Sequence, residues 1–225
     1  MRRSPGVRPA RRQRAACSRL GEDRVQLPPR LVDDGDRAFV LLGAPAVSDL
    51  GDRLRELGTG LRQSHVAIGA PRASRLPRLR AARELRGRPV TIITSNLAVL
   101  DEVRGDDAVE LVLLGGVLRR NQQSLVGPLA EQVLGQLSAD VMFLSCTGVR
   151  GGRVLDNMAV EAPIKQAMIA ASQRIVLLAS ELKFPGSGAL RLCSLDEVDV
   201  LITTPGTPEE EISERREGGG KVIVA

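Results

Sequence analysis

Lysine is rare in this sequence, and two of its three lysines stand where an anion is expected. Lys165 follows Pro163 by two residues, in the first turn of a predicted helix, where the helix dipole disfavours a positive charge. Its charge therefore needs a partner, which is either the carboxylate of Glu161 in a surface ion pair or a bound phosphate or carboxylate. Lys183 follows a predicted strand that ends at Ala179, so it is expected at the same edge of the sheet.

Polar residues and glycines follow other predicted strands and could complete such an anion site. In an open parallel sheet, ligands bind beyond the carboxyl ends of the strands. Each of these turns alone is also typical of any α/β protein, so only their convergence indicates a site. The residues concerned are Gly69, Thr94, Asn96, Gly115, Gly116 and Gly127.

The elements that must position these residues are predicted from residue 64 onward, where β-branched runs alternate with helical patterns. This alternation predicts one α/β domain over residues 64–225, with a mostly parallel sheet and helices on both faces. The strands are predicted at His65–Ile68, Val90–Thr94, Val109–Leu114, Val141–Ser145, Ile175–Ala179, Val198–Thr203 and Val222–Val224. The helices are predicted at Ser74–Arg86, Leu97–Val103, Pro128–Leu137, Pro163–Gln173 and Pro208–Arg216.

Residues 1–63 differ from the rest in charge. Arginines crowd the first 30 residues against only two acidic residues, which predicts a basic arm able to neutralise DNA phosphates. Further on, Ser48 is a predicted N-cap of a short amphipathic helix, as in the first helix of a helix-turn-helix, but Gly58 and Gly60 weaken the helix that should follow. The predicted DNA contacts are Arg11, Arg12, Arg14, Ser48 and Arg53.

Composition excludes several other functions. A single histidine and three cysteines without paired spacing cannot form a usual four-ligand zinc site, and they predict neither a disulfide nor a metal. With three phenylalanines and no Trp or Tyr, base-stacking nucleic-acid platforms are not expected. No apolar run is long enough to span a bilayer, so we expect a cytoplasmic protein. We also expect no cofactor.

Five ordered motifs together resemble a known family. They are 90–96 (VTIITSN), 109–116 (VELVLLGG), 125–128 (LVGP), 161–168 (EAPIKQAM) and 182–184 (LKF). In order and spacing they are similar to the sensor domain of DeoR-type bacterial transcriptional regulators, over about residues 64–225. The N-terminal helix-turn-helix of such regulators would be degenerate or truncated here.

This resemblance implies a fold similar to the ribose-5-phosphate isomerase and CoA-transferase group. It also implies a metabolite-responsive, DNA-binding repressor of carbohydrate metabolism that assembles as a homo-oligomer. The effector would be a phosphorylated sugar or related metabolite, and no residue would be catalytic. Its contacts would be Gly69, Thr94, Asn96, Gly115, Gly116, Gly127, Glu161, Lys165 and Lys183.

Two alternatives stay open at this point. The first is a stand-alone sugar-phosphate sensor that does not bind DNA. The second is an isomerase-like enzyme, in which Glu161 or Asp156 would abstract a proton next to a carbonyl. Neither carboxylate has an obvious partner that would raise its pKa, and one histidine supplies acid-base chemistry poorly.

Overall fold

The structure is a computed structural model that describes residues 38–42, 66–68 and 82–224. By its internal contacts the chain divides into residues 1–35 and 36–225, and all described residues belong to the second unit. The predicted DNA contacts and Gly69 lie outside the described residues. The helix predicted over 74–86 is described only from residue 82, and residues 82–84 are helical.

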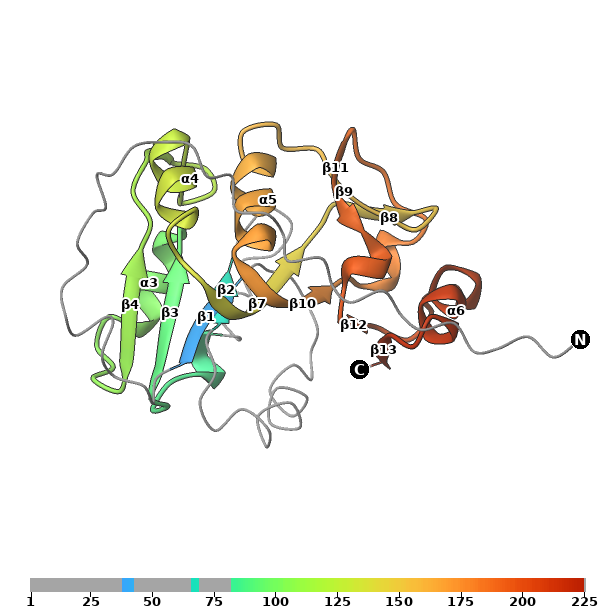
Figure 1. Ribbon diagram of the computed structural model, residues 1–225, viewed down its shortest axis with the longest axis horizontal. Coiled ribbons are helices and arrows are strands. Elements are labelled where there is room, and N and C mark those ends of the chain that lie inside the picture. Colours follow the sequence, from blue (N-terminus) through green and yellow to red (C-terminus); the bar gives the residue numbers. More distant parts are fainter. Residues whose placement is uncertain (1–37, 43–65, 69–81, 225) are drawn as a thin grey trace, which may run out of the picture. The chain divides into compact units, whose positions relative to one another are not determined.

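A parallel sheet of eight strands forms the centre of the second unit (Figure 1). Its order is β4, β3, then β1 and β2, then β7, β10, β12 and β13, and both β1 and β2 pair with β3 and β7. Every pairing in this sheet is parallel. The strands are β1 (Ala38–Leu42), β2 (Val66–Ile68), β3 (Val90–Thr94), β4 (Val109–Leu113), β7 (Ala139–Ser145), β10 (Ser172–Leu178), β12 (Val200–Thr203) and β13 (Lys221–Val224).

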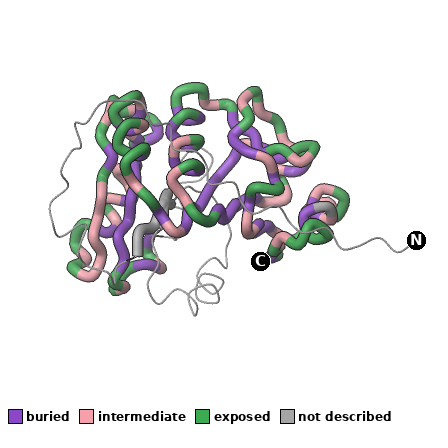
Figure 2. Tube along the Cα trace, viewed as in Figure 1, coloured by how far each residue is buried: buried purple, intermediate pink, exposed green. Residues whose placement is uncertain are grey.

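The seven strands predicted from apolar runs are confirmed, with ends that shift by a few residues. Continuous runs of Val, Ile and Leu are typical of strands covered on both faces, and β3 is buried at every position, as is most of β7 (Figure 2). One strand of the sheet lies before the expected start at residue 64. This strand is β1, which pairs with β3 and β7 although its residues fall within the region 1–63 that was expected to be separate.

Beside the helical residues 82–84, the described part of the chain contains four α-helices. They are α3 (Leu97–Val103), α4 (Pro128–Leu134), α5 (Ala162–Ala170) and α6 (Glu209–Glu217). A proline stands at the first position of α4 and at the second position of α5, because Pro lacks the N–H that the first helical turn leaves unpaired in any case. These positions confirm the four helices predicted after residue 96. No helix in the described part of the chain is long and apolar enough to cross a membrane.

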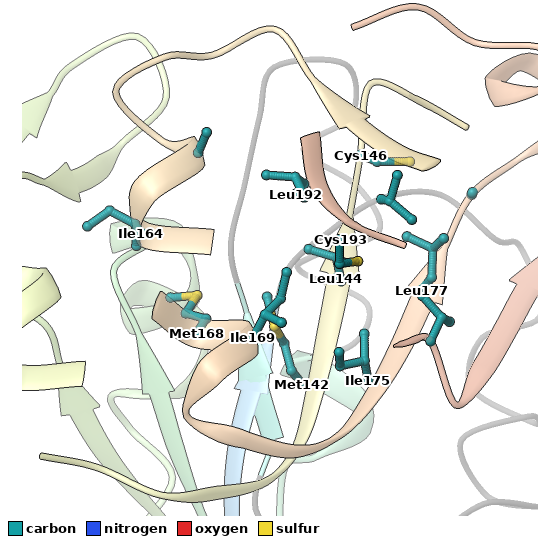
Figure 3. Close-up of a cluster of buried hydrophobic side chains, with 14 of the residues drawn as sticks. Met142, Leu144, Cys146, Ile164, Met168, Ile169, Ile175, Leu177, Leu192 and Cys193 are labelled. Carbon is teal, nitrogen blue, oxygen red and sulfur yellow. The ribbon is translucent and has the colours of Figure 1, made fainter. Parts of the chain in front are cut away.

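Alternate residues of the central strands enter two separate hydrophobic cores, one on each face of the sheet. Met142 and Leu144 of β7 belong to one core, together with Met168 of α5. Val141 and Phe143 of the same strand belong to the other, with α3. Figure 3 shows the first core, in which α5 packs against β7, β10 and a further strand, β11 (Leu190–Ser194). Helices therefore cover both faces, as predicted.

Two small antiparallel sheets complete the fold and were not predicted. The first is a hairpin of β5 (Val117–Arg119) and β6 (Ser124–Val126). The second has the order β11-β9-β8 and consists of β8 (Gly148–Arg150), β9 (Arg153–Asp156) and β11 (Leu190–Ser194). In the sequence, β5 comes directly after β4 and β8 directly after β7. Both small sheets therefore begin at the carboxyl ends of strands of the large sheet, where ligands are expected.

Candidate functional site

A buried ion pair lies where β7 ends. The Nζ atom of Lys165 donates to Oδ2 of Asp156 at 2.5 Å and to the backbone oxygen of Ser145 at 3.1 Å. Lys165 is 1% exposed and Asp156 is fully buried. The second carboxylate oxygen of Asp156 accepts from the backbone N–H groups of Asn157 and Met158, which fixes its orientation.

This pairing corrects one expectation. Lys165 does not use Glu161 as its partner, because Asp156 takes that place and Glu161 pairs with Arg119. The strand β9 that carries Asp156 is too short to stand out in the sequence, so its position beside α5 was not predictable.

A second charged pair adjoins the first. Oε1 of Glu161 accepts from Nη1 of Arg119 at 2.8 Å and from the hydroxyl of Ser124 at 3.2 Å. Arg119 and Ser124 come from the two strands of the β5–β6 hairpin, and Glu161 is the residue before α5. The Leu125 N–H donates to the Ser95 oxygen, just after β3, so the hairpin connects the start of α5 to the carboxyl end of β3.

Two polar atoms of this cluster have no hydrogen-bond partner among the described residues. They are Oε2 of Glu161 and Oγ of Ser145, and both residues are buried, at 3% and 0% exposure. Most buried side-chain polar atoms have a partner, and a missing one costs about 1–3 kcal/mol. Lys165 has a third N–H beyond its two hydrogen bonds. The cluster therefore has unused capacity to accept and donate hydrogen bonds, and because these atoms are shielded from solvent, a ligand reaches them only when neighbouring groups move.

The environment shifts two ionisable groups of the cluster. Burial raises the pKa of Glu161 above its ordinary value, although the charges of Lys165 and Arg119 and the hydrogen bond from Ser124 oppose the shift. Burial raises the pKa of the Cys146 thiol to about 12, against the opposing charges of Lys165 and Lys183. Cys146 is therefore a neutral core residue at physiological pH.

Lys183 lies in a short 3-10 helix, Glu181–Lys183, and is partly exposed. Its charge acts on the Cys146 thiol, and Cys146 directly follows Ser145. Lys183 follows β10, whose Leu178 pairs with Ser145 at the end of β7, so Lys165 and Lys183 lie at the same edge of the sheet. Their contact with an effector stays a prediction.

Thr94 and Asn96 are buried at the end of β3, where their side chains hold the backbone. The hydroxyl of Thr94 accepts from the Asn96 N–H at 3.1 Å, and Oδ1 of Asn96 caps α3 by accepting from the Ala98 N–H at 3.0 Å. The amide nitrogen of Asn96 donates to the backbone oxygen of Gln122. Both side chains thus position the β3 end and the hairpin; a contact with an effector stays a prediction.

Three of the four predicted glycines lie within the described residues, and they differ in their surroundings. Gly116 has a φ of +135°, and a Cβ atom there would lie 2.5 Å from the backbone oxygen of Val126. Gly127 has a φ of +109° and directly precedes Pro128 of α4. Gly115 borders open space. Gly116 and Gly127 are therefore explained by the backbone, whereas Gly115 leaves room for a ligand.

The sequence analysis did not identify four residues of the cluster as binding residues. Asp156 was considered only as a base, and Ser145, Arg119 and Ser124 were not considered. Ser145 could have been found as the polar residue that ends a buried strand. Within the described residues, no group of three or more His, Cys, Asp or Glu side chains could hold a metal ion. The arrangement is suited to binding hydroxyl and anionic groups.

Comparison with known proteins identifies the family. Residues 78–204 match the sequence model of the "DeoR C terminal sensor domain". A transcriptional repressor, AccR, from Agrobacterium fabrum is 29% identical over 122 residues, which cover 53% of this chain and 47% of that protein. The regulator GlpR of Haloferax volcanii is 31% identical over 134 residues, covering 59% and 51%. An L-fucose operon activator of Haemophilus influenzae is 25% identical over 122 residues, covering 54% and 49%.

The chain spans about half the length of the curated relatives it matches, and these relatives are named as transcriptional regulators rather than enzymes. The matched family segment covers more than half of the 225 residues and contains the whole cluster around Lys165 and Glu161. The chain therefore belongs to the DeoR family and carries its C-terminal sensor domain.

Proposed function

We propose that this protein is a DNA-binding transcriptional regulator whose sensor domain binds a phosphorylated sugar or related metabolite. Relatives named as repressors and as activators both occur, so the proposal commits to control by the effector, with repression as the expected direction. The proposal includes self-association of the chain, which light scattering tests directly.

One observation carries the sensor proposal. Oε2 of Glu161 and Oγ of Ser145 are buried and unpaired next to the Lys165–Asp156 pair. Sugar hydroxyl groups both donate and accept hydrogen bonds, so one hydroxyl can donate to Glu161 while another bonds Ser145. Such a ligand satisfies atoms that would otherwise weaken the folded state.

Lys165 and Lys183 have different roles in the proposed binding. Asp156 neutralises Lys165, so this pair orients its surroundings more than it attracts a phosphate. Lys183 is partly exposed at the same edge and makes no ion pair with a described residue, so we place the phosphate group there. A charge-assisted contact of this kind contributes about 1.5–3 kcal/mol.

Isothermal titration of the full chain with matched sugars and sugar phosphates tests the proposal. We expect saturable binding of at least one phosphate ester. Lys183→Met should weaken the ester by tenfold or more and leave the free sugar unaffected, and Glu161→Gln should weaken both. Lys221→Met is the control, because Lys221 is the remaining lysine and lies exposed on β13.

Three results would contradict the proposal. They are no binding at millimolar ester, equal effects of Lys183→Met and Lys221→Met, and chemical conversion of the bound ester. The last result would favour the isomerase-like alternative, in which Glu161 acts as a base.

A further inference from the structure

Three arginines lie on the outer face of the small antiparallel sheet, one on each strand. Arg150 of β8 stands directly opposite Arg153 of β9, and Arg191 of β11 stands opposite Leu155 of β9. Residues two apart on a strand share a face, so Arg153 and Leu155 point the same way. The three arginines therefore surround Leu155. The other face of this sheet contributes Val149 and Val154 to the hydrophobic core.

These arginines line a cavity of about 320 Å³ together with Leu155, Gly188 and Ala189. The segment at Gly188 approaches the sheet closely, because a Cβ atom on Gly188 would lie 2.5 Å from Cβ of Leu155. Hydrogen bonds hold this wall in place: Ala189 N–H donates to Oδ1 of Asn157, and the Thr147 hydroxyl donates to the Ser187 oxygen. The hollow is thus preformed, and its volume is that of a small-ligand site.

The cavity carries positive charge that the described part of the chain does not neutralise. Arg150, Arg153 and Arg191 make no ion pair with any described residue. Other arginines do find carboxylates, such as Arg83 with Glu102. Like charges directly opposite each other in an antiparallel ladder are destabilising, so the Arg150–Arg153 pair weakens the sheet unless an anion lies between them.

We propose that this cavity is a second anion site, which binds a small compound carrying two or more negative charges of the phosphate class. Arginine suits this ligand because its planar guanidinium presents paired N–H donors that match phosphate oxygens. The site is separate from the Glu161 cluster and does not depend on the proposed function. Strand β9 connects the two, since Asp156 next to Leu155 pairs with Lys165.

Titration of the full chain with inorganic pyrophosphate at low salt tests the site. We expect Arg150→Gln, Arg153→Gln and Arg191→Gln each to weaken binding by about tenfold, because each removes a charge-assisted contact. Arg174→Gln should leave the affinity unchanged, since Arg174 is an exposed arginine on β10 that does not line the cavity. Lys183→Met should also leave it unchanged, which separates this site from the proposed effector site.

The variant Arg153→Glu distinguishes a loss of ligand binding from a loss of folding. It should abolish pyrophosphate binding and raise the melting temperature, because an opposed like-charge pair becomes an opposite-charge pair. The proposal is overturned if pyrophosphate does not bind at millimolar concentration, or if Arg174→Gln weakens it as much as the cavity variants. It is also overturned if the cavity variants weaken binding of a DNA duplex while pyrophosphate does not bind, because the arginines would then serve the DNA backbone.

Discussion

Because the ion pair between Lys165 and Asp156 is buried, it has a large effect on the stability of the fold. Breaking a buried pair leaves one charge without compensation and costs about 3–5 kcal/mol, whereas replacing both charges by apolar groups is often neutral. We therefore expect Lys165→Met to lower the free energy of unfolding by about this amount. Urea unfolding followed by circular dichroism measures it.

The matched control is the pair of Arg83 and Glu102. Arg83→Gln should change stability little, because the Arg83 side chain is 57% exposed and Glu102 has a second partner in Arg86. The double variant Lys165→Met with Asp156→Leu should recover part of the loss, although it also removes the acceptor for the Asn157 and Met158 N–H groups. A stability loss in Lys165→Met no larger than that in Arg83→Gln would contradict a buried pair.

Glu161 should make stability depend on pH in a defined direction. Burial raises its folded-state pKa, so the folded chain binds a proton more tightly than the unfolded chain. The stability from this difference is fully present below the ordinary pKa of 4.5 and is lost as pH rises through the raised value. The unfolding free energy of the wild type, minus that of Glu161→Gln, should therefore fall as pH increases over this range.

Chemical unfolding of both proteins at a series of pH values measures this difference. A difference that stays level or rises with pH would show that the positive charges of Arg119 and Lys165 outweigh burial. Effector affinity should change in the opposite direction in the wild type, because a sugar hydroxyl donates to the ionised carboxylate. Glu161→Gln should show no such change.

At the scale of elements, the β5–β6 hairpin holds Glu161 in place through Arg119 and Ser124. The two glycines that lead into it offer a paired test. Gly116→Ala places a methyl group against the Val126 oxygen at a positive φ, so we expect a loss of about 1–3 kcal/mol in stability. Gly115→Ala should leave the melting temperature unchanged, because its surroundings are open. Thermal unfolding of both variants distinguishes them.

If Gly115 also contacts the effector, Gly115→Ala should lower effector affinity at unchanged stability. Equal melting temperatures for the two variants would mean that the hairpin tolerates a shift at Gly116. The position of Glu161 would then depend less on the hairpin than its hydrogen bonds indicate.

The large sheet could be predicted from the sequence, whereas the short strands could not. The strands of the large sheet are continuous apolar runs, which burial on both faces requires. Glu161, Lys165 and Lys183 lie near the carboxyl ends of these strands, and their roles in binding stay predictions. Strands β5, β8 and β9 have only three or four residues, too few for an alternating pattern to be recognised. Arg119 and Asp156 lie on these strands, so their partners depend on tertiary packing that local patterns do not encode.

At the scale of the whole molecule, the proposal requires DNA binding, and its predicted contacts lie outside the described residues. Arg11, Arg12 and Arg14 belong to the basic arm, and Ser48 and Arg53 to the predicted helix. Phosphate contacts give affinity without sequence readout, whereas selectivity needs a stable helix in the major groove. Because Gly58 and Gly60 weaken such a helix, we expect salt-sensitive binding with little sequence selectivity from this chain.

Fluorescence anisotropy of the full chain with a mixed-sequence DNA duplex, at several salt concentrations, tests this expectation. Each neutralised phosphate contributes about −0.9 to the slope of log affinity against log salt, so replacing Arg11, Arg12 and Arg14 by Gln should flatten the slope by about 2.7. The same replacement of the exposed Arg86, Arg104 and Arg174 leaves the basic arm intact and should not change the slope. Equal slopes for both variants would place the DNA contacts elsewhere. No duplex binding by the wild type would favour the stand-alone sensor, because the proposed effector contacts lie in the sensor domain.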